Sequence, residues 1–350
     1  MAGLDRLGEQ GFIDLVARLN RDARPRPILG IGDDAAVIAL PPRAQILLTT
    51  DLLTDGVHFR AASTPGRLLG RKALAVNLSD IAAMGGAPHS FVAALGFPRS
   101  TPLEYARELA AGLVDQARRY GVALVGGDTC AAGRLFVNVA LLGFVEPGRA
   151  VRRGGARPGD ALYVTGTLGG SAAGLLLLRR GVRYAGPSRV TGARLSAAAR
   201  RHAARAVRAH LDPRPRTGAG RALGMTGVAS AMIDLSDGLA IDLPRLCTAS
   251  GTGAVLEEAA IPVAPAARAL FGAKRGLACA LVGGEDYELL FSAPPHHAPT
   301  ITRLARRLGV PMARIGEVLE RRGGIRILTR DGRYRPLPAG GFEHFPHRAA

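Results

Sequence analysis

Two aspartates three residues apart could do chemistry: Asp234 and Asp237, in the stretch Asp234-Leu235-Ser236-Asp237-Gly238-Leu239. The stretch lies between an apolar run and an amphipathic helical pattern, and its Ser and Gly favour a turn. Carboxylates in a turn can reach a ligand, and hard oxygen donors are what Mg²⁺ prefers. The stretch therefore predicts a place that holds metal and phosphate.

Acids with small neighbours recur along the chain. They stand in Gly32-Asp33-Asp34, Thr49-Thr50-Asp51, Leu78-Ser79-Asp80, Gly126-Gly127-Asp128-Thr129 and Gly283-Gly284-Glu285-Asp286. Any one of them could be a helix cap or an Asx-turn, because Asp beside Gly and Ser is common in ordinary turns. Their recurrence in a chain with 28 acidic against 46 basic residues favours a joint role. We expect these segments to converge on one magnesium-nucleotide site.

A nucleotide would be held here mainly through metal. The sequence lacks the phosphate loop G-x-x-x-x-G-K-[ST], and it lacks the glycine loop and H-R-D signature of protein kinases. The turn Gly166-Thr167-Leu168-Gly169-Gly170-Ser171 could offer backbone amides to phosphate at the start of a helix. A strand-to-helix turn needs glycine in any case, so this signal alone leaves both interpretations open.

The formal charge of +18 raises the question of a nucleic-acid partner. Lys72 and Lys274 are the only lysines, so nearly all of the positive charge is arginine. The densest basic run, residues 194–208, has alanine spacers and no interleaved aromatic side chains on which bases could stack. An exposed helix face explains this run better, and we expect no nucleic-acid partner.

Cysteine usage and hydropathy indicate a cytoplasmic protein. Cys130, Cys247 and Cys279 are isolated and form no C-x-x-C pair, which argues against a disulfide framework or a zinc site. Residues 1–10 carry charges and glycine where a signal peptide would need an apolar core. No apolar run approaches the roughly 18 residues of a membrane span, so no membrane partner is expected.

The first half of the chain predicts a β-rich α+β domain over residues 1–148. Helices are expected at 9–20, 64–84 and 102–120, and strands at 35–40, 45–50, 122–125 and 135–145. Asp33 and Asp34 would precede the first strand, Asp51 would follow the second, and the third would break at Gly126. Asp80 would oppose the dipole near the end of its helix, so a positive group should compensate it.

The second half predicts an α/β domain over residues 149–350. Residues 147–158, dense in Gly, Arg and Pro, contain the expected boundary. Strands are expected at 161–165, 278–282 and 287–292, helices from the turn to 178 and at 217–224 and 238–250, and a hairpin at 324–336 turning at Asp331-Gly332. The fold class is therefore α/β with α+β character, in two domains.

Several blocks of the sequence stand out: GIGDDAAV, TTDLLTDGVHF, KALAVNLSDIAAMGG, GGDT, VTGTLGGSAAGL, IDLSDGL, GGEDYELLF and the closing GFEHF. Together and in this order they resemble the thiamine-monophosphate kinase family, a member of the aminoimidazole ribonucleotide synthetase-like superfamily. The resemblance implies an N-terminal domain that dimerises through its strands, a C-terminal α/β domain, and ATP whose phosphates are bridged by several Mg²⁺ ions.

The resemblance also implies roles for individual residues. Metal ligands would be Asp34, Thr49, Thr50, Asp51, Asp80, Asp128, Asp234 and Asp237, and ATP contacts would be Gly127, Asp128, Arg153 and Ser236. Contacts to thiamine monophosphate would be His58, Glu285 and Phe342. Taken without the resemblance, His58 would be an ordinary half-buried histidine, and Arg153 would not stand out among so many arginines. No dedicated catalytic residue is expected.

The expected function is ATP-dependent phosphorylation of thiamine monophosphate by in-line transfer. An alternative in the same fold is another ATP user, the aminoimidazole ribonucleotide synthetase or the hydrogenase maturation factor. Selenophosphate synthetase is disfavoured because no Cys precedes Cys130. A nucleotide-binding or nucleic-acid-binding regulator without turnover is the alternative from a different class.

Overall fold

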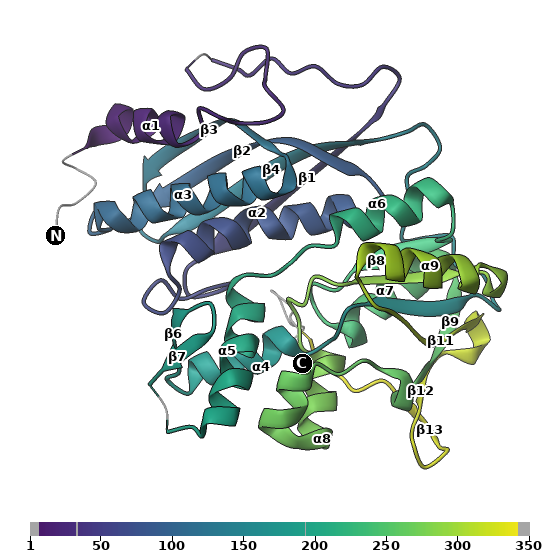
Figure 1. The fold of residues 1–350 in the computed structure, drawn as a ribbon. Coiled ribbons are helices and arrows are strands. Elements are labelled where there is room, and N and C mark those ends of the chain that lie inside the picture. The colour runs from purple at the N-terminus through teal and green to yellow at the C-terminus, as the bar shows by residue number, and fades with distance from the viewer. Residues whose placement is uncertain (1–6, 33, 193, 342–350) are drawn as a thin grey trace, which may run out of the picture. The chain divides into compact units, whose positions relative to one another are not determined.

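The computed structural model describes residues 7–32, 34–192 and 194–341. By the contacts of its chain, the protein divides into two compact units. Unit 1 comprises Met1–Ile81 and Gly86–Gly148, and unit 2 comprises Ala82–Gly85 and Arg149–Ala350. Each unit has a sheet and its own hydrophobic core (Figure 1).

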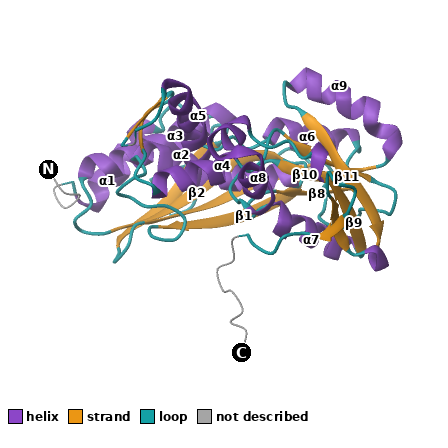
Figure 2. Cartoon of the chain, turned by 90° about the horizontal axis from the view of Figure 1, so that it is seen from below, coloured by secondary structure: helices purple, strands orange, loops and turns teal. Residues whose placement is uncertain are grey.

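The sheet of unit 1 has the strand order β1-β4-β2-β3. Its strands are β1 (Gln45–Thr54), β2 (Ala87–Phe97), β3 (Ala123–Ala131) and β4 (Phe136–Val145), and its helices are α1 (Gly8–Leu19), α2 (Gly66–Ala83) and α3 (Leu103–Tyr120). β2 and β3 are parallel, whereas β4 is antiparallel to both β1 and β2. Figure 2 shows α2 and α3 on one side of this sheet.

Alternation along the strands decides which side chains of unit 1 face the helices. Val137, Val139 and Leu141 of β4 are buried in one cluster with Leu74 of α2 and Leu113 of α3. The residues between them are only half-buried, as expected for a strand with period 2. One face of the sheet therefore supplies the core, and the other is left open.

Unit 2 is built on a sheet with the order β13-β12-β9-β11-β5-β10-β8. Its strands are β5 (Ala161–Thr165), β8 (Ala231–Asp234), β9 (Thr252–Glu257), β10 (Leu289–Ala293), β11 (Met312–Glu320), β12 (Ile325–Leu328) and β13 (Tyr334–Pro336), with β6 (Arg183–Gly186) and β7 (Arg189–Thr191) paired apart from it. Its helices are α4 (Gly170–Arg179), α5 (Ala197–Leu211), α6 (Thr217–Thr226), α7 (Leu239–Ser250), α8 (Pro265–Val282) and α9 (Ala298–Leu308), and short 3-10 turns occur at Glu258–Ala260, Pro295–His297 and Arg321–Gly323.

Both faces of the unit 2 sheet are covered. Leu162 and Val164 of β5 pack in a cluster with α7, whereas Tyr163 packs in a second cluster with α6 and α9. This explains why β5, β8 and β10 are continuously buried rather than alternating. α4, α5 and α8 pack against one another in the same unit (Figure 1).

Most predicted elements are confirmed within one to four residues, including the hairpin of β12 and β13. The strand predicted at 35–40 is wrong, because that segment forms only an isolated bridge between Leu29 and Val37 and is followed by Pro41 and Pro42. The strand predicted at 278–282 is also wrong, because this apolar run is the last turn of α8. A short apolar run does not distinguish a buried helix from a strand by periodicity.

Two acids predicted in loops lie inside strands. Asp51 pairs opposite Val139 within β1, which continues to Thr54. Asp128 lies within β3, which passes through the two glycines because the neighbouring β2 supplies its pairing partners. Gly127 suits this position, since a Cβ there would come within 2.2 Å of the carbonyl oxygen of Ala93. Strands β2, β6, β7, β8, β9 and β11 and helices α8 and α9 were not predicted.

Candidate functional site

In unit 1, β1 and α2 bring three of the predicted metal ligands to the helix-covered side of the sheet. The hydroxyl of Thr49 donates a hydrogen bond to Oδ2 of Asp80. Asp51 lies two residues beyond Thr49 and so faces the same side, where β1 is half-buried rather than exposed. Thr49 thus supplies one hydrogen-bond partner of Asp80 near the end of α2.

Thr50 faces the opposite side of β1. Its side chain is exposed and its hydroxyl donates to Oδ1 of Asn138 on β4, 3.0 Å away. The structure therefore does not bring the Thr50 hydroxyl together with the Thr49 hydroxyl and the Asp80 carboxylate. Asp34 is exposed in a turn preceding Val37.

Asp128 and Gly127 lie at the edge strand β3. The Asp128 side chain is exposed, and its Oδ1 accepts the amide of Thr129 at 2.8 Å. This local bond fixes one carboxylate oxygen against the backbone and leaves the group facing outward. The position suits an acid that meets a charged ligand at the sheet edge.

His58 lies in a tight turn after β1. Its Nδ1 accepts the amide of Thr54 at 3.1 Å, and its own amide donates to the Thr54 carbonyl at 3.0 Å. Because Nδ1 is an acceptor, the neutral ring carries its proton on Nε2. The ring thus has a defined tautomer, with an N–H at the end away from the backbone.

In unit 2, the predicted loop Asp234 to Gly238 joins β8 to α7. Asp234 ends β8 and is buried, and Asp237 begins the turn into α7. The turn is held by Asp242, whose Oδ2 accepts the amides of Asp237 and Gly238 at 3.0 and 3.1 Å. Burial raises the pKa of Asp242 to about 6, while the hydrogen bond from the Asp237 amide opposes that rise.

Arg245 pairs with the acids of this loop from within α7. Its Nη1 contacts Oδ2 of Asp237 and lies 2.8 Å from Oδ1 of Asp242. The buried Asp242 therefore fixes both the backbone and a cation beside Asp237. Asp242 and Arg245 were missed from the sequence, although Asp242 falls in the first turn of a predicted helix.

Residues 283–286, called the GGED segment after their sequence, lie beside this loop. The amide of Glu285 donates to the carbonyl of Ser236 at 2.7 Å, and the amide of Tyr287 donates to that of Leu235 at 3.0 Å. Glu285 and Tyr287 both have positive φ, 65° and 51°, which is uncommon for residues with side chains. The structure thus brings together Ser236 and Glu285, which were predicted to serve ATP and the acceptor respectively.

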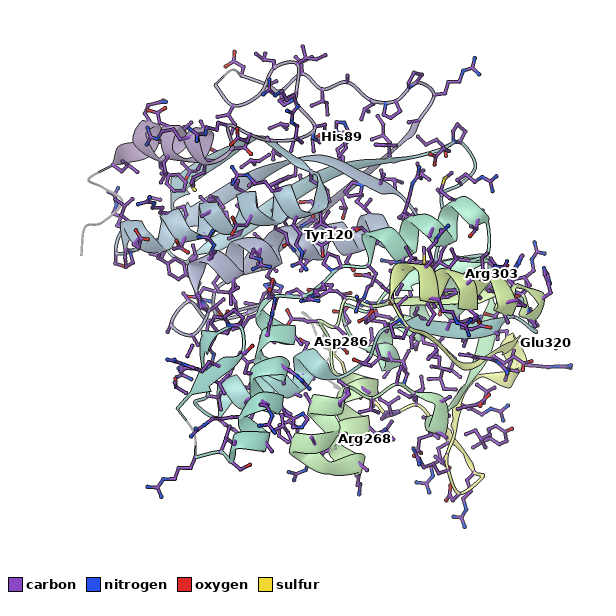
Figure 3. The ribbon with its side chains drawn as sticks, in the orientation of Figure 1. His89, Tyr120, Arg268, Asp286, Arg303 and Glu320 are labelled. Atoms are coloured by element: carbon purple, nitrogen blue, oxygen red, sulfur yellow. The ribbon has the colours of Figure 1, made fainter. Side chains whose placement is uncertain are left out.

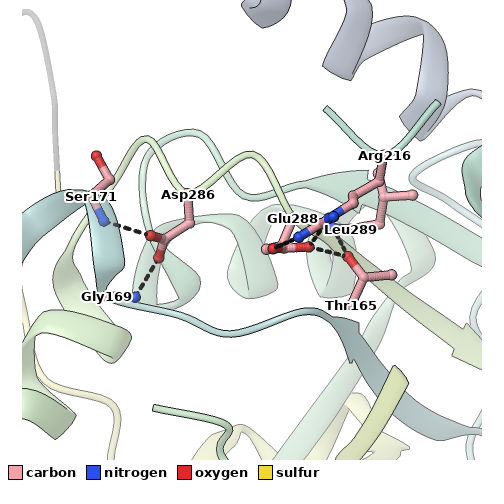
Figure 4. Close-up of polar contacts among 7 residues, drawn as sticks. All are labelled: Thr165, Gly169, Ser171, Arg216, Asp286, Glu288 and Leu289. Carbon is pink, nitrogen blue, oxygen red and sulfur yellow. Dashed lines mark hydrogen bonds and ion pairs between the residues drawn. The ribbon is translucent and has the colours of Figure 1, made fainter. Parts of the chain in front are cut away.

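The side chain of Asp286 accepts hydrogen bonds from backbone amides at the start of α4 (Figure 3, Figure 4). Its carboxylate accepts from Gly169 at 2.5 Å and from Ser171 at 3.1 Å. Burial raises its pKa to about 7, although these amides favour the charged form. A carboxylate of the protein therefore occupies two of the amides that could have received phosphate, and the ordinary-turn interpretation holds for them.

A second network, centred on Glu288, anchors the chain just after the GGED segment to β5. Glu288 accepts from Arg216 through Nε and Nη2 at 2.6 and 2.5 Å, and from the hydroxyl of Thr165 at 2.6 Å (Figure 4). The Thr165 hydroxyl in turn accepts the amide of Leu289 at 2.8 Å. These buried, charge-assisted bonds fix the end of the segment where β10 begins.

The remaining predicted contacts are simpler. Arg153 is exposed, and its carbonyl accepts the hydroxyl of Ser250 at 3.3 Å. Phe342 lies outside the described residues. His210 on α5 was missed because a single histidine in an arginine-rich helix gives no signal in the sequence.

The donor chemistry suits magnesium arriving with a nucleotide. Among the described residues, which exclude Asp33, no group of three His, Cys, Asp or Glu side chains is arranged to hold a metal ion. Mg²⁺ commonly takes one or two carboxylates and completes its octahedron with water and substrate phosphates. Asp51 and Asp80 in unit 1, and Asp234 and Asp237 in unit 2, are hard donors of that kind.

Comparison with known proteins gives matches along most of the chain. Residues 32–145 match the family described as AIR synthase related protein, N-terminal domain, and residues 157–328 match its C-terminal domain. The chain is 38% identical to thiamine-monophosphate kinase of Escherichia coli K12 over 338 residues, covering 96% of this chain and 98% of that protein.

None of the helices that the structure describes has the length and apolar character needed to span a membrane.

Solved structures also match this chain over most of its length. Thiamine-monophosphate kinase from Stenotrophomonas maltophilia K279a superposes with a TM-score of 0.80 at 35% identity, covering 92% of this chain and 96% of that one. A structure described as AaThiL complexed with AMPPCP and TMP has a TM-score of 0.72 at 31% identity and covers 99% of both chains. The hydrogenase maturation protein HypE in complex with ATP shares the fold at 22% identity and a TM-score of 0.71.

Proposed function

The chain belongs to the thiamine-monophosphate kinase family, and from that premise we propose that it transfers the γ-phosphate of ATP to thiamine monophosphate, giving thiamine diphosphate and ADP. The observation that carries this proposal is the match over 99% of both chains to AaThiL, which is described as complexed with AMPPCP and TMP. These are an ATP analogue and the phosphate acceptor. The likeness to HypE, at 22% identity, supports the fold alone.

The acceptor chemistry requires little of the protein as a base. The attacking oxygen belongs to a phosphate that is already ionised near neutral pH, so no residue has to remove a proton from a hydroxyl. The barrier is instead electrostatic, because two polyanions must approach to about 3 Å, at a cost on the order of several kcal/mol. The residues must therefore bind, orient and neutralise the two phosphates.

Aspartates of each unit, with the two threonines that precede Asp51, are proposed as metal ligands. In unit 1 these are Asp34, Thr49, Thr50, Asp51, Asp80 and Asp128, and in unit 2 they are Asp234 and Asp237. The shared side of Thr49, Asp51 and Asp80 supports this role, as does the Asp242 anchor beneath the loop of Asp237. When bound, magnesium would neutralise the charge of the phosphates.

The remaining proposed contacts bind the two substrates. Gly127, Asp128, Arg153 and Ser236 would contact ATP, and the exposed guanidinium of Arg153 is able to pair with phosphate oxygens. His58, Glu285 and Phe342 would contact thiamine monophosphate. Ser236 and Glu285 are adjacent, which supports a contact to ATP and a contact to thiamine monophosphate side by side.

We also propose a homodimer formed through the open face of the unit 1 sheet. Ile46, Leu48 and Leu52 on β1 are exposed, and so is Val92 on β2. Thr50 and Val92 both pair with Ala140, so these side chains lie on one face of the sheet. Exposed apolar side chains gathered on a strand face are typical of an interface. A cytoplasmic location is proposed as well, and the free thiols of Cys130, Cys247 and Cys279 are consistent with it.

The assay that tests the function measures ADP release with three acceptors. Thiamine monophosphate should support turnover and free thiamine should not, because the acceptor must be a phosphate oxygen. Formylglycinamidine ribonucleotide tests the synthetase alternative. Equal turnover with free thiamine, or turnover only with the ribonucleotide, would overturn the proposal.

A further inference from the structure

His210 lies between two segments of the unit 2 site and is part of neither. It is on the buried face of α5 with Ala203, Ala206 and Val207, and its ring is almost fully buried. Its Nδ1 lies 3.1 Å from Oε2 of Glu285 and 3.0 Å from Oγ of Ser171. The ring thus bridges the GGED segment and the start of α4.

The partners of Nδ1 determine which nitrogen carries the proton. An ionised carboxylate can only accept a hydrogen bond, so contact with Glu285 requires a proton on Nδ1. The hydroxyl of Ser171 then lies beside that N–H as a second acceptor. His210 therefore acts as a donor that holds one oxygen of Glu285.

The backbone of Glu285 is fixed independently of this contact. Its φ of 65° is in the left-handed region, and its amide is bound by the carbonyl of Ser236. The next residue, Asp286, is bound by the amides of Gly169 and Ser171. Residues held in sparsely populated backbone regions are often found at functional sites. With the backbone fixed, the direction of the half-buried Glu285 carboxylate depends on its side-chain torsions, and His210 restrains these.

We propose that His210 is a positioning residue that aims the Glu285 carboxylate at the organic part of the acceptor. This inference rests on the proposed function, in which Glu285 contacts thiamine monophosphate. A carboxylate held in one direction recognises a cationic ring or an N–H donor, and thiamine monophosphate offers both a thiazolium ring and an aminopyrimidine. His210 itself touches no substrate and acts through Glu285.

The test compares His210→Leu with His210→Asn. Leucine fills the space and removes the donor, whereas the amide of asparagine lies near the position of Nδ1 and can still donate to Glu285. His210→Leu should raise the KM for thiamine monophosphate about tenfold and change the KM for ATP less than about twofold, and His210→Asn should restore most of the loss. His202→Leu, in the same helix, controls for the loss of a histidine from α5.

The double variant separates positioning from an independent role. If His210 acts through Glu285, His210→Leu combined with Glu285→Gln should have a KM for thiamine monophosphate within about twofold of that of Glu285→Gln alone. If His210→Leu does not fold, His210→Gln replaces it, because its amide extends toward Nε2 and away from Glu285.

Two results would overturn the inference alone: equal increases in both KM values, or full additivity with Glu285→Gln, in a protein whose wild type turns over thiamine monophosphate. Absence of that turnover in the wild type would overturn the proposed function and this inference together.

Discussion

At the scale of single residues, the raised pKa of Asp286 should make the stability of the protein depend on pH, an effect that can be measured without substrate. Its pKa is raised from 3.8 to about 7 in the folded protein. Between these values the folded state holds more protons than the unfolded state, so the free energy of unfolding falls as pH rises from 4 to 7. Asp286→Asn should flatten this dependence by up to roughly 1.4 kcal/mol per pH unit.

Urea denaturation at pH 5, 6 and 7 checks this prediction. The slope of unfolding free energy against pH should be less steep in Asp286→Asn, because asparagine does not titrate. Its absolute stability should also change, since asparagine cannot accept from both Gly169 and Ser171 as a carboxylate does. Asp22→Asn, at an exposed position, controls for loss of one negative charge. Parallel slopes for wild type and Asp286→Asn would show that Asp286 is ionised throughout this range.

At the scale of elements, β1 serves two purposes through its two faces. Thr49 and Asp51 lie on the side of the helices, and Leu48 lies on the open side with 75% of its surface exposed. If this open face forms the dimer, Leu48→Glu should convert the protein to a monomer, because a buried unpaired charge is strongly unfavourable. Light scattering after size-exclusion chromatography measures the mass.

A matched control is available outside the strands. Ile28 is 72% exposed in a loop, so Ile28→Glu makes the same chemical change away from the sheet face. It should leave the mass unchanged. A wild type that is monomeric at micromolar concentration, or a Leu48→Glu variant that remains dimeric, would contradict the proposed interface.

At the scale of the whole molecule, the prediction that acids of both units act on one polyphosphate remains to be tested by kinetics. Asp51→Asn and Asp237→Asn keep the size of the side chain and remove its charge. Each should lower kcat roughly a hundredfold, an effect of about 3 kcal/mol, and higher magnesium should restore part of the activity. The double variant should be little worse than the worse single one, because residues that act as a unit are not additive.

Folding has to be measured alongside these rates. Circular dichroism and thermal melting of each variant distinguish a lost ligand from a lost turn, and Asp14→Asn on the exposed side of α1 gives the effect of a neutral surface change. If Asp51→Asn or Asp237→Asn unfolds the protein while the folded fraction keeps full specific activity, that acid is structural. Multiplying losses in the double variant would argue that the two acids act separately.

The sequence by itself determined the features that depend on neighbours in the chain. Amphipathic periodicity predicted α1, and an Asp-Gly turn predicted the terminal hairpin, because both signals are local. The residues and the order of the conspicuous blocks resemble those of the family, which the comparisons confirm. Local signals failed at 278–282, where a short apolar run fits either helix or strand.

Only the tertiary structure decided which of these residues meet. Thr49 and Asp80 are 31 residues apart in the chain, and Gly169 and Asp286 are 117 apart, so no local pattern could pair them. The side of β1 that each residue faces depends on which side α2 and α3 cover, and the continuation of β3 through Gly127 depends on its pairing with β2. His210 gains its partners only when α5 packs against the segments that carry Ser171 and Glu285, because burial and hydrogen bonding between distant residues arise from packing.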